Sequence, residues 1–396
     1  MKKLLSLVLV AVMAVACFGF ASAEAAKIKL DVILLHDEDS TYDNNFINAA
    51  KAVEEALGIE LVLRRNVDES NACYEVACEL ADEGCNIVFA DSFGHETYMI
   101  EAAKEYPEVE FCHATGTMAH TEKLANFHNA FAAIYEGRYL AGVAAGLKLN
   151  EIKEAGKLKG EVPMMRYVGA FTYAEVVSGY TSFYLGAKSV CPDVIMKVQF
   201  TGSWYDEKEE KAAAEALIAA GADLISQHAD SMGAPTACEN AGIPDVSYNG
   251  STVESCPNTF IVASRIDWAP YFQYIIEQKI AGEAIATDWT GTIATGSVVL
   301  TDVNEQAAAA GTVEKLAEVK AQFEAGTLKV FDTATEGFIT VGGNALTEYM
   351  ADVDTDAAFE KDTQVVADGY FHESEFRSAP YFDVNIDGIE LLNTKF

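Results

Sequence analysis

The sequence has few basic residues and lacks any cluster of them. It holds 27 Lys and Arg against 61 Asp and Glu, which gives a formal net charge of −34. A surface of this kind repels nucleic acids and anionic lipid headgroups. We therefore expect no nucleic-acid partner, and the surplus of acids predicts little beyond good solubility.

Short motifs for phosphate binding and catalysis are also missing. The chain contains no GxGxxG, GxxxxGK[ST], GxSxG or HExxH sequence. Its seven histidines are scattered, and no CxxC pair marks a zinc site or a thioredoxin-like site. We predict a protein that is not an enzyme and that uses no metal and no cofactor.

Long apolar runs are confined to the N-terminus. Lys2 and Lys3 precede an apolar stretch at 4–16, which is typical of a secretory signal and too short for a membrane span. Cleavage after Ala23 predicts a signal peptide at 1–23 and a periplasmic protein. The alternative is lipidation of Cys17, which would give a membrane-anchored lipoprotein after export across the inner membrane.

Seven cysteines follow that segment, so at least one thiol is unpaired. A disulfide is possible in an oxidising compartment, but the spacing of these residues does not indicate a pair.

The chain does contain an alternation of apolar strands and amphipathic helices, and the alternation runs twice. This pattern predicts parallel sheets with helices on both faces, in two Rossmann-like units of similar size. The first unit has predicted strands at 27–35, 60–64, 86–90, 109–113 and 124–127. The second has predicted strands at 166–169, 194–200, 223–227, 245–248 and 259–263.

One strand–helix–strand unit carries an unusual aromatic residue where its strand ends. The apolar run at 198–200 stops at Gly202, Trp204 follows, and an alanine-rich helix begins shortly afterwards. In open α/β sheets, ligands bind beyond the carboxyl ends of the strands. A large flat ring at that place is a platform for another flat ring.

Other strand ends also carry polar and aromatic groups, which predicts a ligand cleft between two lobes. Ordinary roles remain open for several of them: Phe46 and Trp204 as core residues, Asp43 as a helix cap, Asn249 as a turn former and Asp37 as a solvated loop acid. The candidate ligand-binding residues are Asp37, Asp43, Phe46, Trp204, His228, Asp230, Asn249, Asp267 and Trp268.

Four segments, in the same order along the chain, resemble motifs of one family. DNNFI at 43–47 resembles a DKSFN-like helix opening, and YEGRYLAGVAA at 135–145 resembles EEGSFLAGVAA. GSWYDEKE at 202–209 resembles GSFSDPAKG, and SRID at 264–267 resembles a KRVD-like crossover. Over residues 28–330 the chain is therefore similar to the basic-membrane-protein family of bacterial ABC-transporter substrate-binding proteins.

This resemblance implies an α/β type I periplasmic-binding-protein fold, whose two lobes are joined by a three-segment hinge. The implied N-terminal lobe is 24–130 plus 266–294, and the C-terminal lobe is 131–265 plus 295–336. Residues 337–396 would form a C-terminal extension, and the hinge would cross near 126–133, 262–267 and 290–297. The implied partners are a small-molecule purine ligand and a membrane ABC permease, with the protein itself a monomer.

The resemblance also implies how a purine would be held. Phe46 and Trp204 correspond to the two rings that sandwich the base, and Asp37 to the acid that hydrogen-bonds it. Ser264 and Asn249 stand where the nucleoside binders of the family have charged ribose ligands, and Trp268 would add bulk at the position of a sugar. We therefore expect a purine base, adenine-like, rather than a nucleoside.

Four alternatives stay open. The protein could be a purine nucleoside receptor, or a sugar- or amino-acid-binding protein of the same fold. A sensory role, which would feed a regulator instead of a permease, would use the same site. An enzyme of nucleoside metabolism would need a phosphate or metal site, and the sequence shows neither.

Overall fold

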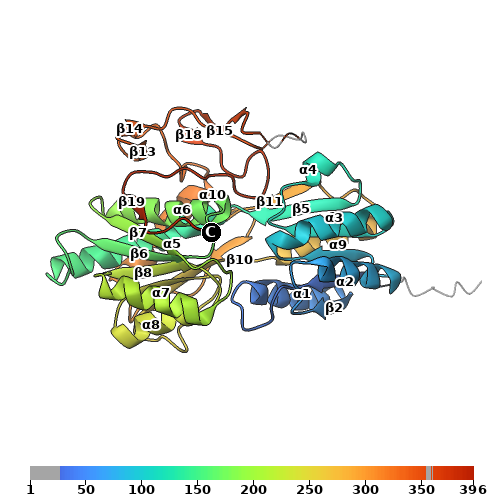
Figure 1. The fold of residues 1–396 in the computed structure, drawn as a ribbon, viewed down its shortest axis with the longest axis horizontal. Helices are drawn as coiled ribbons and strands as arrows, with labels where there is room; N and C mark the ends of the chain where they lie inside the picture. The colour runs from blue at the N-terminus through green and yellow to red at the C-terminus, as the bar shows by residue number, and fades with distance from the viewer. Residues whose placement is uncertain (1–26, 354–357, 359) are drawn as a thin grey trace, which may run out of the picture.

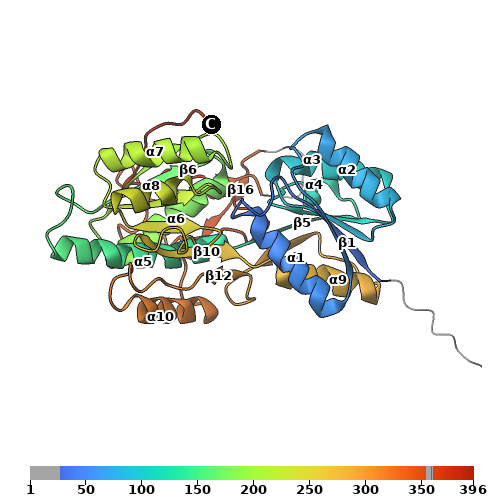
Figure 2. The ribbon, with the colours of Figure 1, turned by 90° about the horizontal axis from the view of Figure 1, so that it is seen from below.

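The computed structural model describes residues 27–353, 358 and 360–396, and it divides into two lobes that lie side by side (Figures 1 and 2). Each lobe is built on a largely parallel sheet with helices on both faces, which confirms the predicted fold class. The predicted signal peptide and Cys17 lie outside the described residues. Within them, no helix combines the length and the apolar character of a membrane span.

The first lobe contains a six-stranded parallel sheet of order β11-β5-β4-β3-β1-β2. Its strands are β1 (Lys29–Ile33), β2 (Glu60–Arg64), β3 (Ile87–Ala90), β4 (Glu110–Ala114), β5 (Phe127–Ala132) and β11 (Asp288–Gly291). Its helices are α1 (Asp43–Leu57), α2 (Asn71–Asp82), η1 (Phe93–His95), α3 (Glu96–Glu105), α4 (Ala119–Glu122) and α9 (Ala269–Ala281).

Helices α1 and α9 cover one face of this sheet, and α2 and α3 cover the other (Figure 2). Every residue of the central strands β3 and β5 is buried, as expected for parallel strands that are covered on both sides. The sequence predicted β5 at 124–127, but the strand begins only at Phe127. Asn126, just before it, turns its amide to donate to the carbonyl groups of Ala103, Tyr106 and Val109.

The second lobe contains a seven-stranded sheet of order β12-β10-β9-β8-β6-β7-β19, which is parallel except between β10 and β12. Its strands are β6 (Met164–Gly169), β7 (Ile195–Phe200), β8 (Leu224–His228), β9 (Asp245–Tyr248), β10 (Phe260–Ile266), β12 (Val298–Leu300) and β19 (Ile389–Leu391). Its helices are α5 (Ile134–Glu154), α6 (Ala174–Val190), α7 (Glu207–Ala219), α8 (Gly233–Ala241) and α10 (Thr312–Glu324).

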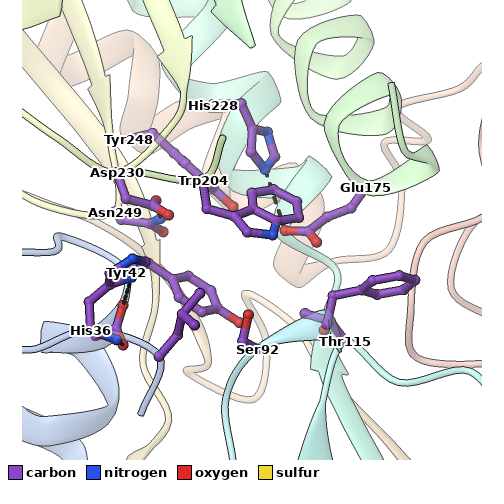
Figure 3. Close-up of a pocket in the computed structure, with 13 residues that line it drawn as sticks. His36, Tyr42, Ser92, Thr115, Glu175, Trp204, His228, Asp230, Tyr248 and Asn249 are labelled. Carbon is purple, nitrogen blue, oxygen red and sulfur yellow. Dashed lines mark hydrogen bonds and ion pairs between the residues drawn. The ribbon is translucent and has the colours of Figure 1, made fainter. Parts of the chain in front are cut away.

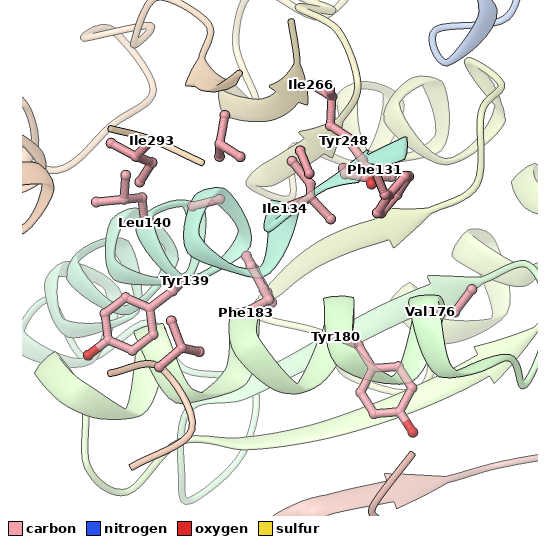
Figure 4. Close-up of a cluster of buried hydrophobic side chains, with 14 of the residues drawn as sticks. Phe131, Ile134, Tyr139, Leu140, Val176, Tyr180, Phe183, Tyr248, Ile266 and Ile293 are labelled. Carbon is pink, nitrogen blue, oxygen red and sulfur yellow. The ribbon is translucent and has the colours of Figure 1, made fainter. Parts of the chain in front are cut away.

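Helices α5 and α6 pack closely side by side (Figure 4), and glycines lie at their contact. A Cβ at Gly142 of α5 would overlap the carbonyl group of Phe183, and one at Gly186 of α6 would overlap the carbonyl group of Tyr139. The surrounding core is apolar and includes Tyr180. This close packing anchors α5, which begins where the chain first enters the second lobe.

The chain passes between the two sheets three times: from β5 to α5, from β10 to α9, and from β11 to β12. The lobe limits 24–130 plus 266–294 and 131–265 plus 295–336 remain our proposal for the division of the chain. The seven cysteines within the described residues are all free.

The segment that follows α10 lies over the second lobe and reaches β11 of the first (Figure 1). The sequence predicted an extension at 337–396 without assigning it structure. Part of it, β19, pairs in parallel with β7 and so extends the second sheet. The remaining strands form short antiparallel pairs: β13 (Thr340–Val341) with β14 (Asn344–Ala345), β15 (Met350–Ala351) with β16 (Thr363–Gln364), and β17 (Val366–Ala367) with β18 (Tyr370–Phe371).

Candidate functional site

A cavity lies between the lobes, where the carboxyl ends of strands from both sheets meet (Figure 3). The first lobe lines it with Leu35, His36, Tyr42, Asp43, Ser92, Phe93 and Thr115. The second lobe lines it with Glu175, Trp204, His228, Asp230, Tyr248 and Asn249. Its place matches the usual ligand position in α/β sheets.

The wall from the first lobe is built around the beginning of α1. The Tyr42 hydroxyl donates to the backbone carbonyl of Asp91 at 2.8 Å, which fixes the phenol ring at the cavity. Asp43 accepts from the backbone N–H of His36 at 2.7 Å and from the Ser40 hydroxyl at 2.6 Å. The first turn of the helix therefore presents one aromatic ring and one carboxylate to the cavity.

Asp43 and the buried Asp91 beneath it carry different charges. Burial alone would raise the pKa of Asp43, but hydrogen bonds from His36, Ser40 and Asp91 lower it below its usual value. Burial, followed by repulsion from Asp43, holds the pKa of Asp91 well above its usual value. We therefore assign a charged Asp43 and a protonated Asp91.

The wall from the second lobe is dominated by Trp204, in the loop between β7 and α7. Its indole meets the ring of Phe171 nearly edge-on, with ring centroids 5.0 Å apart and planes at 66°, and lies 5.9 Å from Tyr173. The chain turns sharply just before it at Gly202, whose φ of +80° is costly for other residues. Figure 3 shows the indole of Trp204 and the phenol of Tyr42 on opposite sides of the cavity.

His228 and Glu175 form a polar pair on the same wall. His228 Nε2 lies 3.4 Å from a Glu175 carboxylate oxygen, and the His228 ring packs at 4.4 Å from Tyr248. Burial lowers the pKa of His228, and Glu175 opposes this only in part. The imidazole is therefore neutral near pH 7, so one ring nitrogen can donate and the other can accept.

Asp230 and Asn249 complete the wall. The Asn249 amide donates to an Asp230 carboxyl oxygen at 3.0 Å. Burial, together with the charges of Asp43 and Glu210, holds the pKa of Asp230 well above its usual value. Asp230 is thus available as a protonated carboxyl that can donate as well as accept.

Two non-glycine residues of the cavity adopt left-handed backbone angles, Thr115 with φ +66° and Asn249 with φ +63°. This conformation is rare for a β-branched residue such as threonine, and such strain concentrates at functional sites. The N–H of Thr115 donates to the carbonyl of Ala130 at 3.1 Å, and that of Asn249 to Ser264 at 2.9 Å. The sheets therefore hold both residues in place.

Direct contacts close the lobes around the cavity. The Thr41 N–H donates to the Asp230 carbonyl at 3.1 Å, and the Asn45 amide donates to the Asn249 carbonyl at 2.9 Å. At the mouth, the rings of Phe93 and Tyr173 approach to 5.3 Å, although each is about 40% exposed (40% and 41%). The structure is a closed form in which a ligand would be largely enclosed.

Five of the nine predicted ligand-binding residues line this cavity: Asp43, Trp204, His228, Asp230 and Asn249. The other four lie elsewhere: Asp37, Phe46, Asp267 and Trp268.

Phe46 and Trp268 belong to the core of the first lobe. They stack on each other with ring centroids 4.5 Å apart and planes at 24°, and they are 0% and 1% exposed. Phe46 was expected to face the ligand, but the structure does not place it in this cavity. The Asp-x-x-aromatic spacing occurs twice, at Asp39–Tyr42 and again at Asp43–Phe46. Phe46 lies one helical turn beyond the cavity, where α1 faces the sheet. Trp268 is also buried in this core and does not line the cavity, so it cannot exclude a sugar from it.

Asp37 and Asp267 support loops instead of lining the cavity. Asp37 accepts from the N–H of Asp39 at 3.1 Å and from the Asn66 amide at 3.4 Å. Asp267 accepts from the N–H of Ala269 at 3.0 Å, at the beginning of α9. Ser264, which was expected at the ribose position, is buried in β10 and does not line the cavity either.

Sequence reasoning missed several residues of the cavity, above all Tyr42 and Glu175. The repeated Asp-x-x-aromatic spacing was a signal for Tyr42, but it could not show which copy faces the cavity. Glu175 opens α6 after a loop rich in aromatic residues, and no motif marked it. Among the described residues, no group of three or more His, Cys, Asp and Glu side chains is arranged to hold a metal ion.

Comparisons with known proteins agree with this architecture. The model of a family described as "ABC transporter substrate-binding protein PnrA-like" (Bmp) matches residues 34–327. A purine-binding protein of Brucella abortus is 35% identical over 266 residues, which are 65% of this chain and 71% of that protein. A putative ABC transporter glucose-binding protein of Haloferax volcanii is 31% identical over 222 residues, 56% of this chain and 53% of that protein.

Solved structures support the fold. An ABC transporter solute-binding protein from Conexibacter woesei superimposes with a TM-score of 0.63. The match covers 76% of this chain and 98% of that one, at 20% sequence identity. At this identity the similarity shows the shared two-lobed fold alone.

Proposed function

The chain belongs to the PnrA-like (Bmp) family of ABC transporter substrate-binding proteins, and from that premise we propose that it binds a purine base between its lobes. The family consists of extracytoplasmic binding proteins of ABC importers, not enzymes. The partners are accordingly a small-molecule ligand and a membrane permease. Periplasmic location, lipid attachment at Cys17 and a monomeric state remain proposals of ours.

The observation that carries the proposal is the pair of aromatic rings, Tyr42 and Trp204, on opposite walls of one closed cavity (Figure 3). A planar heterocycle between them would have both of its faces removed from water. Base–aromatic stacking contributes about 1–3 kcal/mol per base. One ring comes from each lobe, so ligand binding would favour the closed arrangement.

The polar lining supports a ligand that donates hydrogen bonds. The carboxyls of Asp43, Glu175 and Asp230 line the cavity, and among the described residues no Lys or Arg does. A nucleotide or an amino acid would bring an anionic group without a cationic partner, which is costly in a buried site. A base with an exocyclic amine and a ring N–H matches these acceptors, and adenine has both.

Fewer residues support a base over a nucleoside in the structure than in the sequence. Since Ser264 and Trp268 do not line the cavity, only Asn249 remains of the three residues behind that expectation. Asn249 already donates to Asp230, which leaves fewer free polar groups for a ribose. We retain the base as the proposed ligand and the nucleoside as the alternative.

Isothermal titration calorimetry with adenine, hypoxanthine, adenosine and guanosine tests the proposal. We expect adenine to bind most tightly, and no purine binding below about 100 μM, or roughly −5.5 kcal/mol, would overturn it. Mass spectrometry of small molecules released on denaturation gives an independent answer if the purified protein retains its ligand.

A sugar is the second candidate, because the Haloferax volcanii relative is named as a putative glucose-binding protein. Sugars also stack on aromatic rings, but the ring is then surrounded by many hydroxyl-binding groups. Glucose and ribose in the same titration series, with leucine as a representative amino acid, separate these classes. A sugar that binds where the purines do not would replace the proposed ligand.

A further inference from the structure

The segment at the carboxyl end of the described chain lies against the base of the Trp204 loop. After β19 pairs with β7, the Asn393 amide group makes two hydrogen bonds to the backbone of Phe200. It accepts from the Phe200 N–H at 2.8 Å and donates to the Phe200 carbonyl at 2.9 Å. Phe200 is the last residue of β7, four positions before Trp204, so the added strand extends to the ligand-facing edge of the sheet.

Phe396 also contacts two loops that carry aromatic residues, the loop at 170–173 and the loop at 201–206. Its ring fills the space beside Gly202, where a Cβ would lie only 2.5 Å from the ring. Its backbone oxygen accepts from the N–H of Thr172 at 3.1 Å. Thr172 lies between Phe171 and Tyr173, the two residues whose rings pack against Trp204.

The beginnings of these two loops are also hydrogen-bonded to each other beside Phe396. The N–H of Gly202 donates to the carbonyl of Ala170 at 2.8 Å, and that of Thr201 donates to Gly169 at 2.9 Å. Phe396 therefore lies against the hydrogen-bonded beginning of both loops, at the point where the Trp204 loop leaves the sheet. The end of the chain lies beside the space between the lobes in both views (Figures 1 and 2).

We propose that Phe396 is a positioning residue for the ligand site, which holds the Gly202 turn and the 171–173 loop so that the Trp204 indole faces the cavity. The proposal rests on the proposed function for its ligand, since it assigns Trp204 a stacking role. The family model ends at residue 327, so the contact comes from a segment outside the part of the chain that the family model matches.

The test uses three single variants of the full chain: Phe396→Ala, Phe396→Tyr and Leu392→Ala. Phe396 and Leu392 are both 42% exposed and lie four residues apart, so Leu392→Ala is a matched control for loss of apolar surface at this end. We expect Phe396→Ala to weaken adenine binding about tenfold, the equivalent of one aromatic contact. Phe396→Tyr keeps the ring and should retain the affinity, as should Leu392→Ala.

A second measurement needs no ligand. In a Trp289→Phe background, acrylamide quenching reports Trp204, because the remaining indole, Trp268, is 1% exposed. Phe396→Ala should increase this quenching while the melting temperature stays within a few degrees of that of Leu392→Ala. If the parent protein binds no purine, the proposed function fails, but the quenching result still decides the role of Phe396. Unchanged quenching, or equal effects in Phe396→Ala and Leu392→Ala, would overturn the positioning role.

Discussion

At the scale of single residues, the position of an aromatic ring along α1 decides whether it lines the cavity or fills the core. Tyr42 and Phe46 are four residues apart, and in a helix that separation places them on one face, one turn apart. Their rings are in contact, with centroids 5.0 Å apart and planes at 68°. Only Tyr42, at the beginning of the helix, reaches the cavity.

This difference predicts opposite effects for two substitutions. Tyr42→Ala should weaken adenine binding by about 1–3 kcal/mol through lost stacking, with little loss of stability. Phe46→Leu should lower the free energy of unfolding by about 1 kcal/mol and leave the adenine affinity of the folded protein unchanged. Titration calorimetry and thermal unfolding of both variants check this. Weaker binding in Phe46→Leu with normal binding in Tyr42→Ala would restore Phe46 as the stacking residue.

The indole of Trp204 gives a second prediction at this scale. Trp204→Ala should weaken adenine binding roughly tenfold or more, because one of the two stacking faces is lost. Trp289→Phe is the control, since Trp289 packs at 5.1 Å from Tyr271 in the first lobe and does not line the cavity. Equal affinity in Trp204→Ala and the parent protein would end the stacking hypothesis.

At the scale of elements, the crossing of α5 over α6 depends on residues that lack side chains. Gly142 and Gly146 of α5 are four residues apart and both face α6, and Gly186 of α6 faces α5. Because a Cβ at any of them would overlap backbone atoms of the other helix, the helices could not stay this close. Helix α5 begins at a crossing between the lobes, so its position also sets where the chain enters the second lobe.

Added side-chain atoms at this crossing should therefore destabilise the folded protein. Gly142→Ala and Gly186→Ala should each lower the free energy of unfolding by about 1–3 kcal/mol, measured by denaturant titration. Gly160→Ala is the matched control, because a Cβ there meets no atom within 4 Å and the residue has no left-handed φ. We expect that control to remain within about 0.5 kcal/mol of the parent protein. If Gly142→Ala and Gly186→Ala were as stable as Gly160→Ala, the helices could move apart without a loss of stability and the prediction would be wrong.

At the scale of the whole molecule, a highly acidic chain also buries several carboxyl groups. Asp31, Glu210, Asp245 and Glu373 are each at most 2% exposed. Burial is the main cause that raises their pKa values, to about 6 for Asp31 and about 7 for the other three. The folded state therefore holds protons that the unfolded chain would release above about pH 4.

The sign of the resulting pH dependence follows directly. Stability from these groups is fully present below the unfolded pKa values of about 4 and is lost as pH rises through about 7. Repulsion within the anionic chain acts in the same direction. We expect the melting temperature to be several degrees lower at pH 8 than at pH 5, with Asp245→Asn reducing that difference. A melting temperature that rises over this range would contradict the prediction.

The sequence by itself determined the repeating strands and helices and the polar and aromatic residues that follow the strands. The repeated pattern of apolar strands and amphipathic helices predicted parallel sheets, because a strand that is covered on both faces is mostly apolar. Trp204, His228, Asp230 and Asn249 were predictable for a related reason. They lie at the ends of strands or within four residues beyond them, and the carboxyl ends of parallel strands meet at one edge of a sheet.

Only the tertiary structure decided which of two equally spaced aromatic residues faces the cavity, and where residues 337–396 go. Helical periodicity places Tyr42 and Phe46 on one face, but the position of α1 along the sheet sets which turn of that face reaches the cavity. The pairing of β19 with β7 joins segments almost 200 residues apart. A three-residue strand carries no local signal for a distant partner, because its hydrogen bonds depend on an open sheet edge that exists only after the lobe has folded.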